Sequence, residues 1–350
     1  MKWGHGNFKF SRPIRWIISL YNNQILDFDV MDIEPNLTIS KKTRGHRLFN
    51  NDIEIEEPSG YFAIMRNYGV ISDRAERKEA ILNLVNKASI DLNLHPDLNE
   101  GLLSELIDLV EKPNLILGTF DSKYLCLPAE VLCTVMKSHQ RYIPFLKKGK
   151  RIDKLKITSE DILSTNFLCI SNGLSTSEKI IRRGNEKVLK ARFADAKFFI
   201  EADQEISCES RNKKLKDISY LKGLGNINER VQRISYISEI LVRELKDRDI
   251  DLDTVLKASQ FSKNDLCSEI VYEFPELQGL MGGKYLRKEG YSKDISLAVA
   301  EHYLPRFYKD DLPSTKYAAV ISIADKLETL ISIYVIGERP TGSSDPYALR

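Results

Sequence analysis

The sequence lacks the cysteine patterns of a disulfide-stabilised or zinc-binding protein. Its five cysteines are an odd number, and no two of them stand in a CxxC pair. It also lacks the roughly 20 uninterrupted apolar residues that a membrane-spanning helix needs, because charged residues interrupt even its most apolar stretch, Tyr317 to Ile336. The first residues contain no apolar core of a secretion signal. These absences predict reduced thiols, no membrane span and a cytoplasmic location.

Short motifs of nucleophilic and nucleotide-binding enzymes are also missing. None of the five histidines lies in an HExxH context, and neither a GxSxG elbow nor a P-loop is present. Gly223 and Gly225 form a GxG, but no strand precedes them, so they predict a helix end followed by a turn. We therefore predict no catalytic residue and no bound cofactor on this chain.

Net charge is nearly absent as well. The 52 Lys and Arg residues and the 50 Asp and Glu residues leave a formal charge of +2, so affinity for a polyanion would have to come from a local patch. What the sequence does contain is the composition of a globular protein, with 42% hydrophobic and 29% charged residues. A length of 350 residues predicts two or three domains.

The first half mixes strand-like and helix-like segments without strict alternation. Asn22 and Asn23 separate two apolar runs within residues 16–30, which predicts a β-hairpin. Asp73 is placed to cap a helix whose apolar residues recur at helical spacing. Further strands are predicted at 53–58, 114–120, 141–146 and 166–172, and helices at 61–67, 73–92, 99–110 and 129–138. The fold class is therefore predicted to be α+β, with a mixed α+β domain over residues 1–175.

Residues 176–222 are predicted to form a basic helical connector. It begins with a long helix that carries a basic stripe opposite an apolar one. The apolar stripe consists of Ile181, Val188, Leu189, Ala196 and Phe199. The basic stripe consists of Arg183, Lys187, Lys190 and Lys197. Between Glu178 and Lys222, twelve basic residues stand against eight acidic ones. This local excess would suit a phosphate backbone, and an ordinary solvated helix face is the alternative explanation.

A second basic group surrounds Gly45. It consists of Lys42, Arg44, His46 and Arg47. A glycine at this position would let the backbone approach a phosphate closely, whereas a solvated loop is the commoner explanation of such a segment. Both basic groups are candidate phosphate contacts.

The second half shows helical periodicity only. Asn226 or Asn228 is placed to cap a helix that reaches about residue 245. Further helices are predicted at 252–264, 265–274, 292–302 and 314–336. We therefore predict an all-helical domain over residues 223–350.

Eight strings distributed along the chain are more informative together than any one of them alone. They are RPIRWI (12–17), TRGHR (43–47), MKSHQRYIPFL (136–146), RGNEKVLKARFADAKFF (183–199), EFPELQGLMG (273–282), EHYLPR (301–306), ADKLETL (324–330) and RPTGSSDPYALR (339–350). In this order they resemble the β subunit of bacterial glycyl-tRNA synthetase, the form built from separate α and β chains. The resemblance covers the chain nearly end to end.

The resemblance implies a ligase whose aminoacylation site lies on a partner α subunit, which binds ATP, Mg²⁺ and glycine. The β subunit would bind tRNA(Gly) through the two basic groups and support the reaction in a cytoplasmic heterotetramer. This chain would be a fragment without the N- and C-terminal parts of that subunit. A rival interpretation is a structural subunit whose basic helix faces the α chain instead of RNA.

The helical half is also similar to the HD superfamily of metal-dependent phosphohydrolases, which hold a metal with His and Asp ligands. By that resemblance Asn264 replaces a histidine, Asp265 remains, Asp325 fits a later aspartate and His302 an accessory ligand. We expect a degenerate site without a metal, in which the carboxylates cap helices or pair with basic residues and the imidazole is a satisfied polar group. The alternative is an active phosphohydrolase that uses Asp265, His302 and Asp325.

Overall fold

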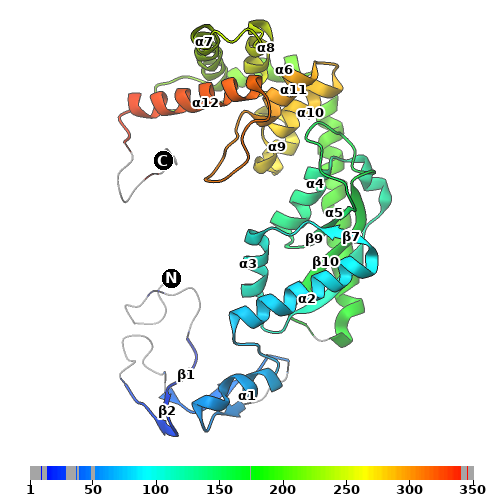
Figure 1. Ribbon diagram of the computed structural model, residues 1–350, viewed down its shortest axis with the longest axis vertical. Helices are drawn as coiled ribbons and strands as arrows, with labels where there is room; N and C mark the ends of the chain where they lie inside the picture. The colour runs from blue at the N-terminus through cyan, green and yellow to red at the C-terminus, as the bar shows by residue number, and fades with distance from the viewer. Residues whose placement is uncertain are drawn as a thin grey trace. The chain divides into compact units, whose positions relative to one another are not determined.

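The protein, a computed structural model, is described for residues 9, 14–28, 37, 39–48, 52–173, 175–339 and 345. It divides into two compact units (Figure 1). Unit 1 comprises Met1–Thr119, Gln140–Lys148 and Asn166–Lys187, and unit 2 comprises Phe120–His139, Gly149–Thr165 and Val188–Arg350. The predicted segments 1–175, 176–222 and 223–350 are contiguous, whereas the observed units interleave along the chain.

Short strand pairs occupy the described N-terminal part of unit 1. β2 (Leu20–Tyr21) and β3 (Gln24–Ile25) form the predicted hairpin, with Asn22 at a φ of 51° in its two-residue turn. β1 (Ile17–Ile18) pairs in parallel with β4 (Ile39–Ser40), and β5 (Lys42–Arg44) pairs antiparallel with β6 (Asp52–Glu54). Helix α1 (Tyr61–Asn67) packs on them. Residues 29–30 of the predicted hairpin segment lie outside the described residues.

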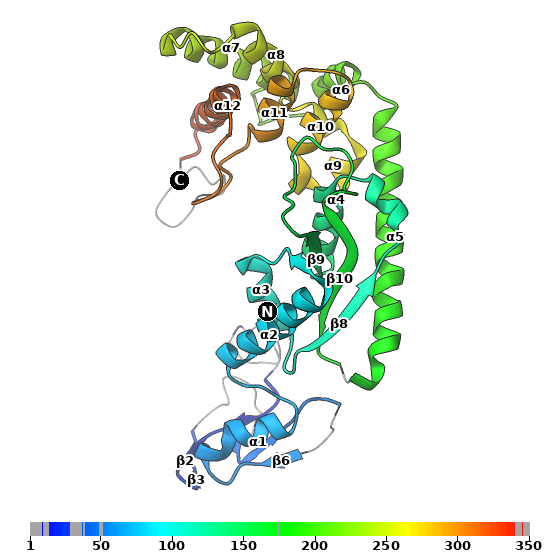
Figure 2. The same ribbon diagram turned by 45° about the vertical axis from the view of Figure 1, so that its right-hand side comes forward.

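The larger part of unit 1 is a four-stranded sheet in the order β7-β9-β10-β8 (Figure 2). Its strands are β7 (Leu94–Pro96), β9 (Ile143–Lys147), β10 (Leu163–Ser171) and β8 (Asn114–Thr119). Helices α2 (Arg74–Leu92) and α3 (Glu100–Leu109) cover one face and share a buried apolar core with the strands. Asp73 caps α2 as predicted, because its carboxylate accepts hydrogen bonds from the amides of Ala75 and Glu76.

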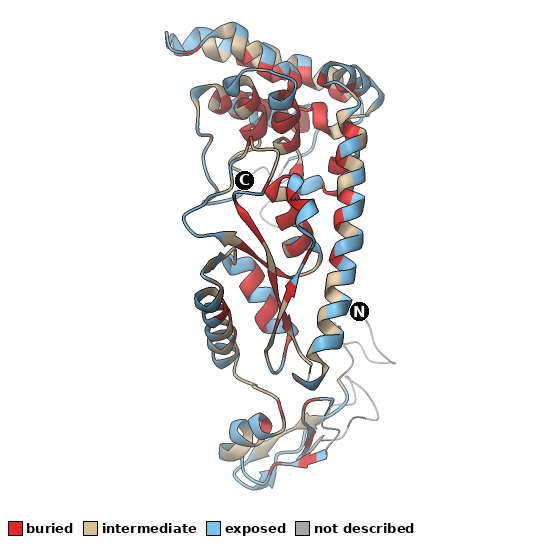
Figure 3. Ribbon diagram, turned by 90° about the vertical axis from the view of Figure 1, so that its right-hand side faces the viewer, coloured by how far each residue is buried: buried red, intermediate tan, exposed pale blue. Residues whose placement is uncertain are grey.

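Helix α5 (Glu178–Gln204) is 27 residues long and supplies residues to both units. Leu189, Phe193, Ala196 and Ile200 form its buried stripe, and Figure 3 shows exposed residues along the other side. The predicted amphipathic helix is therefore confirmed. Val188 departs from the predicted pattern, because it is 41% exposed although it was expected on the apolar side.

Unit 2 is mainly helical. Besides the C-terminal part of α5, its helices are α4 (Ala129–Thr134), α6 (Cys208–Lys214), α7 (Ile227–Leu245), α8 (Leu252–Phe261), α9 (Glu269–Glu273), α10 (Leu280–Lys288), α11 (Lys293–Glu301) and α12 (Lys316–Val335). A π-helical turn over Val135–His139 continues α4. Asn226 caps α7, as one of the two predicted alternatives. The predicted helix 265–274 is interrupted, because Ser268 has an extended ψ of 145° and its hydroxyl caps a new helix, α9.

The chain as a whole is a mixed fold of helices and small sheets, which agrees with the predicted mixture of both element types. Among the described residues, no helix combines the length and the apolar composition that crossing a bilayer requires.

Candidate polyanion-binding surfaces and a buried ionic cluster

The basic stripe of α5 is open to solvent over most of its length. Arg183, Lys187 and Lys190 are exposed, and they form no ion pair with any residue that the structure describes. Lys197 is half-buried, and its Nζ lies 3.6 Å from Oε1 of Glu201. At a rise of 1.5 Å per residue, the four cations span about 21 Å of helix. Such a row of cations can face several phosphates of one nucleic-acid backbone.

The sequence reasoning missed one residue of this stripe. Lys179 lies four positions before Arg183, is exposed, and is likewise without an ion pair in the described chain. The helical spacing that groups the other four cations could have found it. By contrast, Arg192 forms an ion pair, because its Nη1 lies 3.1 Å from Oε1 of Glu273.

Only three of the four residues of the second basic group are exposed. Lys42, Arg44 and Arg47 are exposed, and Lys42 and Arg44 point to the same side of β5 because they are two positions apart. The Nε atom of Arg44 lies 3.2 Å from Oδ1 of Asp52, and its guanidinium lies 5.4 Å from the ring centroid of Trp16. Arg44 is therefore oriented by neighbours within unit 1.

His46 is buried in the unit, and Gly45 is half-buried. The side chain of His46 is 3% exposed, so it supports the segment from within and does not reach a bound phosphate. A Cβ atom on Gly45 would lie 2.7 Å from the carbonyl oxygen of Tyr68, and the amide of His46 donates to the same oxygen at 2.9 Å. Gly45 therefore permits a close approach to the backbone of Tyr68.

The four residues at the positions expected for a degenerate metal site are all buried in unit 2, but Asp265 has hydrogen-bond partners different from those of His302 and Asp325. Oδ2 of Asp265 accepts hydrogen bonds from the amides of Gly279 and Gly282, at 2.6 and 2.9 Å. Asp265 thus caps the start of α10 from a distant part of the chain. Oδ1 of Asp265 and both amide atoms of Asn264 have no hydrogen-bond partner among the described residues.

His302 and Asp325 are joined by a lysine that the sequence analysis did not single out. Nζ of Lys263 lies 2.9 Å from Nε2 of His302 and 2.9 Å from Oδ1 of Asp325. The same ammonium lies 3.7 Å from the ring centroid of Tyr303. Lys263 precedes Asn264 and Asp265 directly, but nothing in that local sequence signals that its side chain points inward.

A second layer of charge surrounds this lysine. Nη2 of Arg230 on α7 lies 2.9 Å from Oδ1 of Asp325, and its Nε lies 2.9 Å from Oε2 of Glu328. Arg233 pairs with the other oxygen of Glu328 at 2.9 Å. These contacts tie α7 to α12 through charge-assisted hydrogen bonds.

The protonation states follow from burial and charge together. Burial lowers the pKa of Lys263 to about 8, against the opposing attraction of Asp325, so the amine is charged at neutral pH. Burial also lowers the pKa of His302 well below 6.5, and the nearby lysine lowers it further, so the imidazole is neutral. For Asp265, burial raises the pKa to about 6, although the amides of Gly282 and Gly279 oppose the shift.

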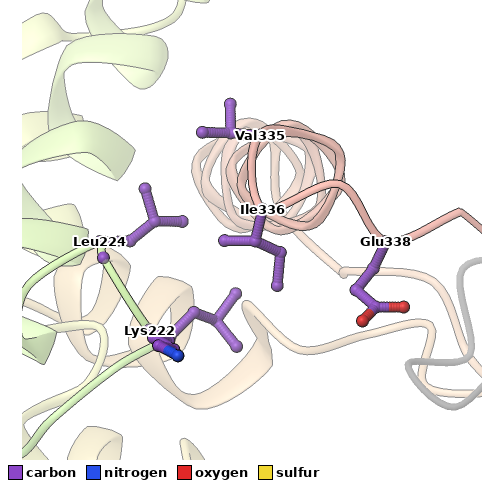
Figure 4. A pocket seen from close by; sticks show the side chains of 7 residues that line it. Lys222, Leu224, Val335, Ile336 and Glu338 are labelled. Atoms are coloured by element: carbon purple, nitrogen blue, oxygen red, sulfur yellow. The ribbon is translucent and has the colours of Figure 1, made fainter.

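Unit 2 also has a surface pocket of about 560 Å³ at the end of α12 (Figure 4). Its lining is Leu221, Lys222, Gly223, Leu224, Val335, Ile336 and Glu338. None of the predicted site residues lines it. Gly223 and Gly225 have φ values of 83° and 74°, which confirms that the GxG forms a turn.

Comparison with known proteins places the chain among subunits of aminoacyl-tRNA synthetases. A family profile described as "Glycyl-tRNA synthetase beta subunit" matches residues 1–350. The chain therefore belongs to the glycyl-tRNA synthetase beta subunit family, which confirms the resemblance inferred from the eight strings.

Individual relatives agree with the family. The chain is 39% identical over 350 residues to the glycine–tRNA ligase beta subunit of Bacillus subtilis (strain 168), with 100% of this chain and 49% of that protein covered. The corresponding protein of Clostridioides difficile (strain 630) is 41% identical over 351 residues, and that of Trichodesmium erythraeum (strain IMS101) is 38% identical over 351 residues. Both alignments cover 100% of this chain and 48% of the relative. The chain thus spans about half the length of the curated relatives it matches.

Proposed function

We propose that this chain binds tRNA(Gly) as part of the β subunit of a glycine–tRNA ligase and supports the ATP-dependent attachment of glycine. The observation that carries the proposal is the row of exposed cations on α5, at Arg183, Lys187 and Lys190. Family membership supports the ligase part of the proposal, and the cation row supports the proposal that α5 contacts the polyanion.

The electrostatics of the chain support a local contact surface. A formal charge of +2 over 350 residues gives little general attraction to nucleic acid. On α5, in contrast, Arg183, Lys187 and Lys190 follow one another at about one helical turn, and none of the three forms an ion pair with a described residue. Each phosphate that such a cation neutralises releases a condensed counterion, so binding through this stripe depends steeply on salt.

The remaining parts of the reaction are proposed to lie on a partner. An α subunit would carry the aminoacylation site and bind ATP, Mg²⁺ and glycine, and the two subunits would form a cytoplasmic heterotetramer. The name of the family, a beta subunit, supports the existence of such a partner. Lys42, Arg44 and Arg47 are proposed as a second contact group, with His46 supporting their segment from inside.

Unit 2 is proposed to be an HD-like scaffold that has lost its metal chemistry. A phosphohydrolase would need Asp265, His302 and Asp325 to share one metal. Instead, Asp265 is engaged with backbone amides, while the other two contact Lys263. These contacts do not favour the hydrolase alternative.

The proposal is tested by reversing two charges on α5. In the double variant Lys187→Glu/Lys190→Glu, we expect tRNA(Gly) affinity to fall by roughly tenfold or more. The slope of log affinity against log salt should become shallower by about 2, since about one phosphate contact is lost per lysine. Filter binding over a salt series measures both quantities.

The matched control is Lys78→Glu/Lys87→Glu, which makes the same charge change on exposed positions of α2. This control should bind tRNA like the wild type. Equal affinity and slope in wild type and the α5 variant would reject the stripe as an RNA contact. If the α5 variant instead loses only its association with the α chain, the structural-subunit interpretation is supported.

A further inference from the structure

Unit 2 contains a lysine side chain that is completely buried. Lys263 is 0% exposed, and its position after α8 places its ammonium among residues of α12 and of the segment that follows α11. Lysine is almost never fully buried unless its charge is paired.

The three hydrogens of the ammonium have three partners. Oδ1 of Asp325 and Nε2 of His302 each lie at 2.9 Å, and the Tyr303 ring centroid lies at 3.7 Å. Nδ1 of His302 lies 2.7 Å from the carbonyl oxygen of Val299, which can only accept, so Nδ1 carries the imidazole proton. Nε2 is therefore a free acceptor, and it takes a hydrogen bond from Lys263.

This arrangement has the elements of a cation site. A neutral imidazole nitrogen and a carboxylate oxygen are the donor types that bind a divalent metal in proteins. Here they are directed at a cation that belongs to the chain itself. The guanidinium of Arg230 contacts the same carboxylate oxygen at 2.9 Å, so positive charge already surrounds Asp325 on two sides.

We propose that the Lys263 ammonium is a built-in structural cation that stands in the place of a metal ion between His302 and Asp325. It neutralises the carboxylate, orients the imidazole, and holds the end of α11 against α12. Arg230 extends this connection to α7. The cluster is thus a closed structural site, and the inference does not depend on how the chain binds tRNA.

The residues present do not fit a metal in addition to the lysine. An ion between His302 and Asp325 would have to displace an ammonium that lies within hydrogen-bond distance of both. Asp265, the remaining carboxylate, already accepts the amides of Gly279 and Gly282 through Oδ2. Over the described ranges, no group of three or more His, Cys, Asp or Glu side chains is placed to hold an ion.

The first measurement uses the wild-type chain. Elemental analysis after purification without chelator should find no stoichiometric Zn, Mn, Fe, Co or Ni. The thermal midpoint in the presence of EDTA should equal that in its absence. One metal ion per chain, or a midpoint that EDTA lowers, would overturn the proposal whether or not any variant folds.

The second measurement replaces the cation. Lys263→Met keeps most of the side-chain volume but leaves His302 Nε2 and part of Asp325 without a partner, so we expect the thermal midpoint to fall by roughly 5–15 °C. Lys263→Ala leaves a space about the size of a propyl chain with its amine. Propylammonium chloride should raise the midpoint of this variant more than propanol does at the same concentration, after subtraction of the wild-type response.

Ile321→Ala on α12 is the matched control, because it opens a space at another fully buried position of the same unit. For this variant propanol should restore the midpoint at least as well as propylammonium, since its space is apolar. A midpoint of Lys263→Met within 1–2 °C of the wild type, roughly 0.5 kcal/mol or less, contradicts the proposal. Equal rescue of Lys263→Ala by the charged and the neutral compound contradicts it as well.

Discussion

The carboxylate of Asp203, near the C-terminal end of α5, accepts a 2.8 Å hydrogen bond from the hydroxyl of Tyr285 on α10. The same carboxylate accepts hydrogen bonds from the backbone amides of Glu269, at 2.8 Å, and Ile270, at 3.2 Å. Asp203 therefore caps α9 from a different helix. One buried carboxylate fixes the end of the basic helix to two other elements of unit 2.

We expect Asp203→Ala to lower the free energy of unfolding by about 2–4 kcal/mol, because two buried donors and one part-buried donor lose a charged acceptor. Urea denaturation followed by circular dichroism measures the change. Asp195→Ala is the control, since Asp195 is exposed on the same helix and its removal should alter stability by only about 0.5 kcal/mol or less. Similar losses in the two variants would show that the buried capping contacts contribute little.

Gly184 weakens α5 without a packing reason. A Cβ atom at this position would meet nothing within 4 Å, and the residue is in a helix interior, where alanine is favoured over glycine. We expect Gly184→Ala to stabilise the chain by about 0.5–1 kcal/mol. The affinity for tRNA(Gly) should be unchanged, because Gly184 lies off the basic stripe. Urea titration and filter binding measure the two effects.

Gly118→Ala serves as the opposite case. A Cβ atom at Gly118 would lie 2.3 Å from Cζ of Phe167, so overpacking should cost about 1–3 kcal/mol. Equal destabilisation by Gly184→Ala and Gly118→Ala would contradict the open space around a Cβ atom at Gly184.

The stability of unit 2 should depend on the ionisation of Asp325. Burial raises the pKa of this carboxyl, but the charges of Lys263 and Arg230 outweigh that effect and hold the pKa at about 2. An acid whose pKa is lower in the folded than in the unfolded state stabilises the fold above its unfolded pKa of about 4. That contribution is lost as the pH falls from about 4 to about 2.

We therefore expect the wild type to lose roughly 2 kcal/mol more than Asp325→Asn between pH 4 and pH 2. Urea unfolding at a series of pH values measures the difference between the two proteins. Parallel stability curves over this interval would mean that the ion pair with Lys263 has no net effect on folding.

Most helices and their first residues were predictable from local sequence. Asp73 and Asn226 cap α2 and α7 because a short polar side chain before an apolar repeat satisfies amides of the first turn. The three-residue strand β7 was not predicted, since it is defined by its pairing with β9 rather than by its own composition. The interleaving of the two units was not predictable from the sequence either, because no change of composition marks the points where the chain passes from one unit to the other.

The candidate sites also contain features that local sequence predicts and features that depend on distant residues. Helical spacing predicted the cation stripe of α5. The same spacing adds Lys179 to the stripe. Spacing could not show that His46 is buried or that Gly45 packs against Tyr68, because both facts depend on a residue more than twenty positions away. It also could not show that the side chain of Lys263 turns inward.

By itself, the sequence determined the local features of this protein: its amphipathic helices, its helix caps, its row of cations and its family. These depend on residues a few positions apart, whose relation is set by the geometry of one helix or strand. Only the tertiary structure decided which charges neutralise one another. His302 and Asp325 contact the same ammonium because helix packing brings both side chains to Lys263. No local sequence pattern specifies these contacts.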